Sequence, residues 1–148
     1  PVLNRRAFER ELARTLAYCK RYEASAAVVY IDLDGFKAVN DRYGHLVGDA
    51  AIRRVAEILT GNVRESDLVA RLGGDEFAIL LMQADKVSAE AKASSLMALI
   101  RTDSFTAEGE RVPLGASAGV RAYVGQGSAE EWLAEADAAM FVRKRSTR

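Results

Sequence analysis

The sequence predicts an α+β sandwich, in which helices cover a mixed central sheet. Helix and strand patterns alternate along the chain, and two neighbouring strand patterns lie close enough to form a hairpin. The 148 residues suit one domain with its own hydrophobic core. No internal repeat, low-complexity tract or linker interrupts the alternation, so residues 1–148 are expected to form a single domain.

The first half of the chain contains patterns for a helix, a buried strand and a further helix. Asn4 is a suitable N-cap for the first helix. Three apolar residues then recur at helical spacing: Phe8, Leu12 and Leu16. Residues 26–32, AAVVYID, form an apolar and β-branched run of strand length. The further helix is predicted at 48–61, with Gly61 ending it in the left-handed conformation.

A hairpin opens the second half. Residues 68–72 and 77–82 read as strands around Gly73 and Gly74, and such a pair supplies the positive φ angles that a tight hairpin needs. Three patterns follow: a helix at 88–101, one or two strands at 111–124, and a last helix opened by the capping-box pair Ser128 and Glu131. The predicted order therefore places helices on either side of each strand region.

Composition excludes several classes of protein. Lysines and arginines (21) equal aspartates and glutamates (21), and this balance disfavours a sequence-independent nucleic-acid binder. Cys19 is the single cysteine, so no disulfide or cysteine metal site can form, and the chain fits a reducing compartment. No apolar run approaches the ~18 residues of a membrane span. We therefore expect a cytoplasmic domain without a membrane segment or a nucleic-acid partner.

Two pairs of acidic residues are the strongest candidates for chemistry. Asp32 closes the most apolar strand pattern, and Asp34 lies on the same side if the strand continues. Asp75 and Glu76 stand where the second hairpin strand begins. Either pair alone is explained by a capped turn or by solvated hairpin ends. Together they would form an oxygen-rich cup, which is the kind of site that Mg²⁺ takes in phosphoryl or nucleotidyl transfer.

The segment after Asp32 is compatible with a nucleotide. Gly35 allows backbone amides to turn inward, and Lys37 adds positive charge, although such a lysine is commonly a surface residue. A Walker A motif is absent from the sequence. Asn40 and Asp49 supply an amide and a carboxylate, which complement the guanine edge, but residue type alone leaves that role open.

Four ordered motifs carry a resemblance to a known family. They are NRRAF at 4–8, DLDGFKAVNDRYGHLVGD at 32–49, GGDEF at 73–77 and DAAMFVRK at 137–144. The chain thereby resembles the GGDEF-domain diguanylate cyclases over essentially its whole length. The resemblance implies a mostly antiparallel sheet wrapped by helices, like nucleotidyl cyclases and polymerase palms. It also implies that 1–148 is the C-terminal output domain of a longer signalling protein.

The resemblance implies a reaction as well. Two GTP molecules would condense to cyclic di-GMP with loss of two pyrophosphates, each held by one subunit of a homodimer. Asp32, Asp75 and Glu76 would be catalytic and, with the Leu33 carbonyl, would hold one or two Mg²⁺ ions per subunit, Mn²⁺ being an alternative. The remaining GTP-binding residues would be Gly35, Phe36, Lys37, Asn40, Asp49, Gly73, Gly74, Lys144 and Arg148. For Lys144 and Arg148 the plain alternative is basic residues favoured at a helix end. No general base is evident.

A further motif, RESD from Arg64 to Asp67, resembles the family's RxxD inhibitory site at the expected spacing before GGDEF. It would bind cyclic di-GMP and damp activity, whereas the plain alternative is a surface ion pair. The sequence departs from the family at its ends, with PVL before NRR and STR in place of Gly-Arg-Asn. Two competing functions remain: a domain that senses GTP or cyclic di-GMP without turnover, and a nucleotidyl cyclase of other specificity.

Overall fold

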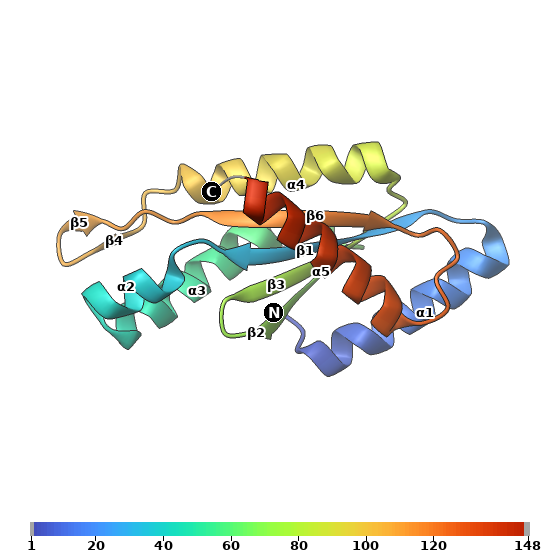
Figure 1. Cartoon of the computed structure of the whole chain (residues 1–148), viewed down its shortest axis with the longest axis horizontal. Coiled ribbons are helices and arrows are strands. Elements are labelled where there is room, and N and C mark those ends of the chain that lie inside the picture. The colour runs from blue at the N-terminus through green and yellow to red at the C-terminus, as the bar shows by residue number, and fades with distance from the viewer. Residues whose placement is uncertain (1, 147–148) are drawn as a thin grey trace.

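A four-stranded antiparallel sheet forms the centre of the molecule in the computed structural model, which describes residues 2–146 (Figure 1). Its strand order is β2-β3-β1-β6, and a separate hairpin pairs β4 with β5. The elements are α1 (Arg5–Tyr22), β1 (Ala26–Leu33), α2 (Phe36–Tyr43), α3 (His45–Gly61), β2 (Leu68–Gly73), β3 (Glu76–Met82), α4 (Lys86–Arg101), β4 (Thr106–Ala107), β5 (Glu110–Arg111), β6 (Ala116–Ala122) and α5 (Ala129–Ser146).

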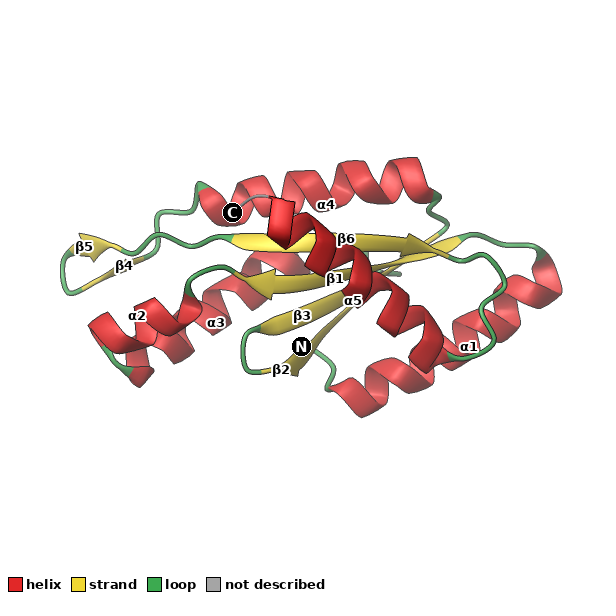
Figure 2. Cartoon of the chain, viewed as in Figure 1, coloured by secondary structure: helices red, strands yellow, loops and turns green. Residues whose placement is uncertain are grey.

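Helices cover both faces of the sheet (Figure 2). Each face has its own hydrophobic core. Because side chains alternate along a strand, β1 sends Val29 and Ile31 toward α3 and α4, and Val28 and Tyr30 toward α1 and α5. An isolated parallel bridge joins Leu3 to β2, so the sheet is mixed but mostly antiparallel, as predicted. The alternation also places acidic residues at the end of β1 on a defined face.

The predicted Asn4 cap is confirmed, and the predicted Ser128–Glu131 capping box forms in one of its two hydrogen bonds. The Asn4 side chain accepts a hydrogen bond from the Ala7 amide at 2.8 Å. At the start of α5, the Glu131 amide donates to the Ser128 hydroxyl at 3.1 Å, and the Glu131 carboxylate accepts from the Gly127 amide. The stripe that follows is buried, as expected: Leu133, Ala136 and Met140.

Two turn predictions are wrong. Gly61 lies inside α3, and the helix ends at Asn62 with φ −124°, so no left-handed glycine closes it. The φ angles of Gly73 and Gly74 are also not positive. Instead, the register shifts between Arg71 and Gly73, and the Arg71 guanidinium donates to the Gly74 carbonyl at 2.7 Å. A bulge and an arginine therefore close this hairpin.

Gly119 of β6 determines how closely α5 approaches the sheet. A Cβ at this position would lie 1.9 Å from the Met140 amide nitrogen and 2.5 Å from the Met140 Cα. The helix backbone therefore rests directly on the strand, an approach that only glycine permits. Lys144 follows one helical turn after Met140, so this contact positions it over the end of β1.

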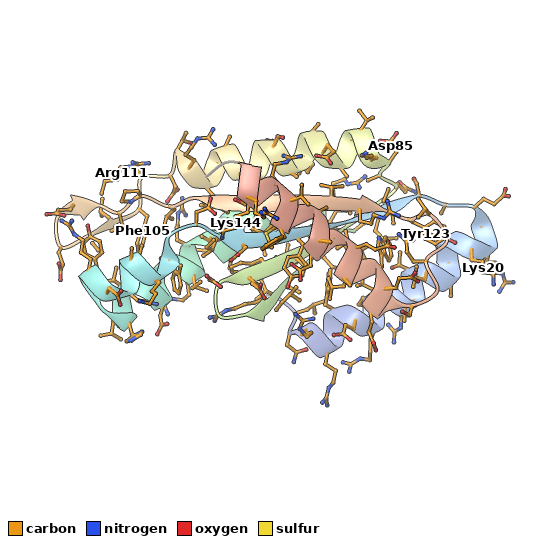
Figure 3. The ribbon with its side chains drawn as sticks, viewed as in Figure 1. Lys20, Asp85, Phe105, Arg111, Tyr123 and Lys144 are labelled. Atoms are coloured by element: carbon orange, nitrogen blue, oxygen red, sulfur yellow. The ribbon has the colours of Figure 1, made fainter. Side chains whose placement is uncertain are left out.

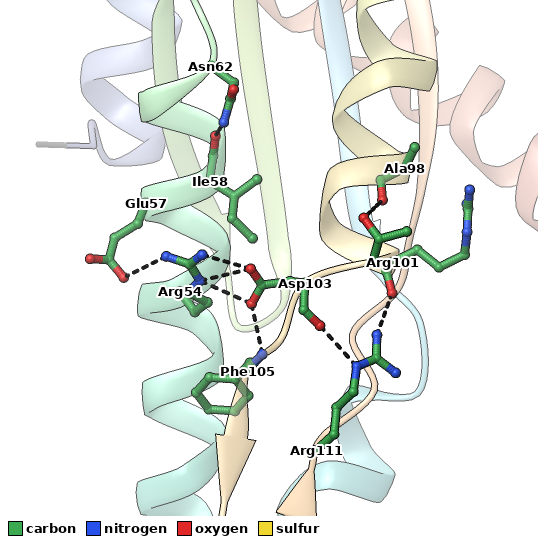
Figure 4. A network of polar contacts seen from close by, with 10 residues as sticks. Arg54, Glu57, Ile58, Asn62, Ala98, Arg101, Asp103, Phe105 and Arg111 are labelled. Carbon is green, nitrogen blue, oxygen red and sulfur yellow. Dashed lines mark hydrogen bonds and ion pairs between the residues drawn. The ribbon is translucent and has the colours of Figure 1, made fainter.

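The β4–β5 hairpin was not predicted, and a network of polar contacts ties it to the helices (Figure 4). Arg54 on α3 donates to both carboxylate oxygens of Asp103, with Nη2 2.7 Å from Oδ1. Asp103 also accepts from the Phe105 amide, and its carbonyl accepts from Arg111. The hydrogen bonds from Arg54 hold the pKa of the Asp103 carboxyl below its ordinary value.

Candidate functional site

The ends of β1 and β3 bring the predicted acidic residues together. The strands are antiparallel, and Asp32 stands directly opposite Glu76. The Leu33 amide donates to the Asp75 carbonyl at 3.0 Å, which joins the hairpin turn to the end of β1. Because directly opposite residues have Cβ atoms about 4.5–5.5 Å apart on one face, the Asp32 and Glu76 carboxylates share a small region.

Lys144 from α5 extends into this acidic region. Its Nζ lies 2.8 Å from Asp32 Oδ2, 3.3 Å from Asp34 Oδ1 and 3.4 Å from the Leu33 carbonyl oxygen. Figure 3 labels it on the stretch of α5 that crosses the sheet. Burial opposes its charge, but bonds with Asp32 and Asp34 outweigh burial and raise the pKa of Lys144. The lysine therefore remains a cation between the carboxylates.

Glu76 is held on its other side by Tyr30. The Tyr30 hydroxyl donates to Glu76 Oε1 at 3.1 Å. Partial burial raises the pKa of the Glu76 carboxyl, and the charges of Asp32, Asp137 and Asp75 act in the same direction, against the opposite effect of the Tyr30 hydrogen bond. Burial and the Glu76 charge raise the pKa of Tyr30 to about 12. The hydroxyl is therefore a permanent donor at ordinary pH.

The donor set fits a divalent cation. The oxygens of Asp32, Leu33, Asp75 and Glu76 are hard ligands, and an ammonium already contacts two of these residues, where a metal ion would be expected. Across the described residues 2–146, no group of three or more His, Cys, Asp or Glu side chains is arranged to hold a metal. Asp32 and Glu76 could offer one or two carboxylates to a divalent cation such as Mg²⁺, which usually completes its shell with water and phosphate oxygens.

The predicted nucleotide segment lies at the same end of β1. Gly35 has φ +66° and precedes α2 as its N-cap, so the chain turns sharply after Asp34. Lys37 is exposed on α2, 3.4 Å from Asp41. Asn40 packs its amide against Gly48 of α3, and the exposed Asp49 is the next residue along. The two candidate guanine-binding residues therefore come from two adjoining helices.

Arg64 and Asp67 form an ion pair in the loop just before β2. The Asp67 side chain is 1% exposed and accepts from the Arg64 amide, the Arg64 guanidinium and the Met82 amide. The Arg64 side chain is 54% exposed and borders a cavity of about 270 Å³. The Asp67 carboxylate thus satisfies the backbone amides of Arg64 and Met82, while much of the Arg64 side chain is exposed to solvent.

One predicted site residue, Arg148, lies outside the described residues. Two residues that were not predicted, Tyr30 and Asp137, adjoin the acidic region. Alternation along β1 was the available signal for Tyr30, because it lies two residues before Asp32 and therefore on the same face. No helix among residues 2–146 is both long and apolar enough to cross a membrane.

The antiparallel sheet, its covering helices and the carboxylates at the end of its central strands define the cyclase palm class. The family model described as "Diguanylate cyclase, GGDEF domain" matches residues 1–148, and the chain belongs to this family.

Individual relatives and solved structures are consistent with membership of this family. The chain is 39% identical over 142 residues to the bifunctional diguanylate cyclase/cyclic di-GMP phosphodiesterase MucR of Pseudomonas aeruginosa, with 95% of this chain and 21% of MucR covered. It is similar to the solved GGDEF domain of TpbB from the same species (TM-score 0.92, 37% identity, 98% and 91% of the two chains). It is also similar to the GGDEF domain of DgcB from Caulobacter crescentus in complex with c-di-GMP (TM-score 0.92, 26% identity, 99% and 88%). The chain thus spans about a fifth of MucR.

Proposed function

We propose that this chain is a diguanylate cyclase domain, which condenses two GTP molecules into cyclic di-GMP and two pyrophosphates. The observation that carries the proposal is the meeting of Asp32 and Glu76 at adjoining strand ends, beside the cationic Lys144. Family membership supports it, as do the names of the relatives and the c-di-GMP bound to DgcB. The relatives' greater length supports a place for the domain in a longer signalling protein, in the cytoplasm where GTP is available.

Each group of residues has a separate task in this reaction. Asp32, the Leu33 carbonyl, Asp75 and Glu76 would hold Mg²⁺ or Mn²⁺, which supplies charge neutralisation for the triphosphate and the leaving pyrophosphate. The turn at Gly35 presents amides to the β- and γ-phosphates, and Lys37 adds charge. After nucleotide binding, Lys144 can exchange its carboxylate partners for phosphate oxygens.

The remaining residues orient the bases and bring the two nucleotides together. Asn40 and Asp49 would bind the guanine edge from α2 and α3, and the open approach at Gly73 and Gly74 leaves room for the nucleotide. Each subunit holds one GTP, so two subunits must face each other for each 3′-hydroxyl to reach the other α-phosphate. A symmetric homodimer is the arrangement that permits both attacks.

Product analysis tests the reaction. Purified protein with GTP and Mg²⁺ is expected to yield cyclic di-GMP, and Glu76→Gln should fall below roughly 1% of the parent rate. Glu57→Gln, which removes an exposed carboxylate on α3, is the matched control and should retain activity. Chromatography of the products formed from a mixture of GTP and ATP distinguishes a diguanylate cyclase from a nucleotidyl cyclase of other specificity. If the folded parent chain forms no product at any protein concentration, the proposed cyclase activity is refuted.

Product inhibition is the second part of the proposal. Arg64 is the exposed partner of the RxxD pair, and its guanidinium can pair with phosphate or stack on guanine. Calorimetry with cyclic di-GMP should show binding that Arg64→Ala abolishes and that Arg53→Ala, an exposed arginine on α3, leaves unchanged. Equal affinity in all three proteins would exclude this inhibitory site.

A further inference from the structure

Tyr30 is a buried side chain with a polar end directed at the acidic region. Its relative exposure is 3%, and it lies on the face of β1 that also carries Asp32. The register pairs Tyr30 with Ala78 of β3, so Glu76 is its diagonal neighbour on the same face. Since Ala78 is small, the tyrosine ring can reach across it to Glu76. A buried tyrosine hydroxyl requires such a partner.

Glu76 is held by this contact on one side. Tyr30 donates to Oε1 at 3.1 Å, and the same oxygen lies 3.7 Å from the place where a Cβ on Gly73 would stand. The hydroxyl thus holds one oxygen of the carboxylate near the hairpin turn. A glutamate has three rotatable side-chain bonds, so without the hydroxyl its carboxylate would sample several orientations.

We propose that Tyr30 is a positioning residue, whose hydroxyl orients Glu76 so that its second oxygen can bind the divalent cation shared with Asp32. In this role Tyr30 would act only through its hydrogen bond to Glu76. The inference rests on the proposed function in one respect, since it takes Glu76 to be a ligand of that cation. Removing a group that orients a metal ligand in this way typically lowers the metal affinity by roughly 10–100-fold.

Tyr30→Phe isolates the hydroxyl, because the ring that packs beneath α1 and α5 is retained. Binding of Mn²⁺ in the presence of 3′-deoxy-GTP, which cannot attack, is measured by electron paramagnetic resonance of the free ion. We expect Mn²⁺ affinity to fall roughly 10-fold. Tyr123→Phe removes another hydroxyl from the same hydrophobic core and should leave the affinity unchanged. Unchanged affinity in Tyr30→Phe would overturn the proposal.

A metal titration of activity separates positioning from packing. In Tyr30→Phe the rate should recover at high Mg²⁺, and the KM for GTP at saturating Mg²⁺ should match that of the parent. A rate that excess metal does not restore would identify a packing role and contradict the inference. Product formation plays no part in the Mn²⁺ measurement, so the proposed reaction and the role of Tyr30 are tested separately.

A double-mutant cycle covers the case in which Tyr30→Phe folds poorly. Glu76→Asp shortens the side chain, which then no longer reaches the hydroxyl. In the Glu76→Asp background, Tyr30→Phe should produce no further change in Mn²⁺ affinity. If Tyr30→Phe damages the fold in general, the affinity should fall in this background as well. Additive losses in the double variant would show that Tyr30 acts independently of Glu76 and would exclude a positioning role.

Discussion

Gly48 has no side chain, and this leaves room for Asn40, which is proposed to bind guanine. A Cβ at this position would stand 1.8 Å from Asn40 Oδ1, and 2.9 Å from its Cγ. The obstructing atoms belong to the end of a side chain, so the backbone can stay while Asn40 moves away. The nucleotide-binding consequence of a substitution here can therefore be separated from its effect on folding.

We predict that Gly48→Ala raises the KM for GTP several-fold and leaves the fold stable, because displaced Asn40 no longer binds guanine. Gly61→Ala is the matched control: Gly61 lies in the same helix with nothing within 4 Å of its added Cβ. Alanine should stabilise that position by up to about 1 kcal/mol and leave the KM unchanged. Steady-state kinetics and denaturant unfolding of both variants provide the comparison, and equal KM values would contradict the guanine role of Asn40.

The raised pKa of Glu76 makes stability depend on pH in a known direction. Burial, the largest cause, disfavours the ionised form, so the folded chain holds this proton to higher pH than the unfolded chain does. The associated stability is present below the ordinary glutamate pKa of about 4.3 and is lost as pH rises through the folded value. Glu76→Gln remains neutral throughout.

In metal-free buffer, Glu76→Gln should therefore melt above the parent at pH 8, and the difference should shrink as the pH approaches that of an ordinary glutamate. Thermal unfolding of both proteins across this range measures the effect. Glu57→Gln, at an exposed position on α3, is the matched control. A melting difference that is constant with pH would contradict the assigned cause.

At the scale of elements, the contact between β6 and α5 connects the sheet to the site. Gly119→Ala would place a Cβ against the helix backbone, where no side chain can rotate away. We predict a loss of about 1–3 kcal/mol in the free energy of unfolding, together with reduced activity, because α5 carries Lys144 away from Asp32. Denaturant unfolding and initial rates check both effects. A variant with parental stability and rate would show that the helix adapts without moving its lysine.

Element types could be predicted from the sequence more reliably than their ends. Apolar periodicity was sufficient for β1, α3 and α5, because burial against a sheet produces a simple repeat. The hairpin was predicted, but its geometry was not, since the bulge depends on Arg71 bonding to carbonyls that only the folded turn presents. Strands β4 and β5 are two residues each, too short to produce a pattern.

At the scale of the whole molecule, the proposed reaction requires two copies of the chain. When the dimer is a minor species, the rate should rise with the square of the protein concentration, because each productive site needs two subunits. Initial rates measured across a dilution series, with mass photometry of the same samples, test this dependence. A rate per subunit that stays constant on dilution, with only monomers present, would exclude turnover across a dimer.

The acidic residues were predictable because each belongs to a motif of consecutive residues. In the structure, the register of β1 and β3 places Asp32 opposite Glu76. Tyr30 was missed for a physical reason: a tyrosine inside an apolar strand looks like core until its diagonal neighbour is known. The contact of Lys144 with Asp32 spans 112 residues and depends on where α5 crosses the sheet. Such long-range positions follow from packing rather than from any local pattern.

Lys144 has a practical consequence for handling the protein. Since its own ammonium relieves the repulsion among carboxylates, the domain need not wait for a metal ion to fold, unlike small zinc-dependent domains. Chelator should leave the melting temperature of the nucleotide-free protein unchanged in a scanning fluorimetry run. In the proposed reaction the metal ion would bind together with the nucleotide, so we expect that the nucleotide-free domain can be purified and stored without it.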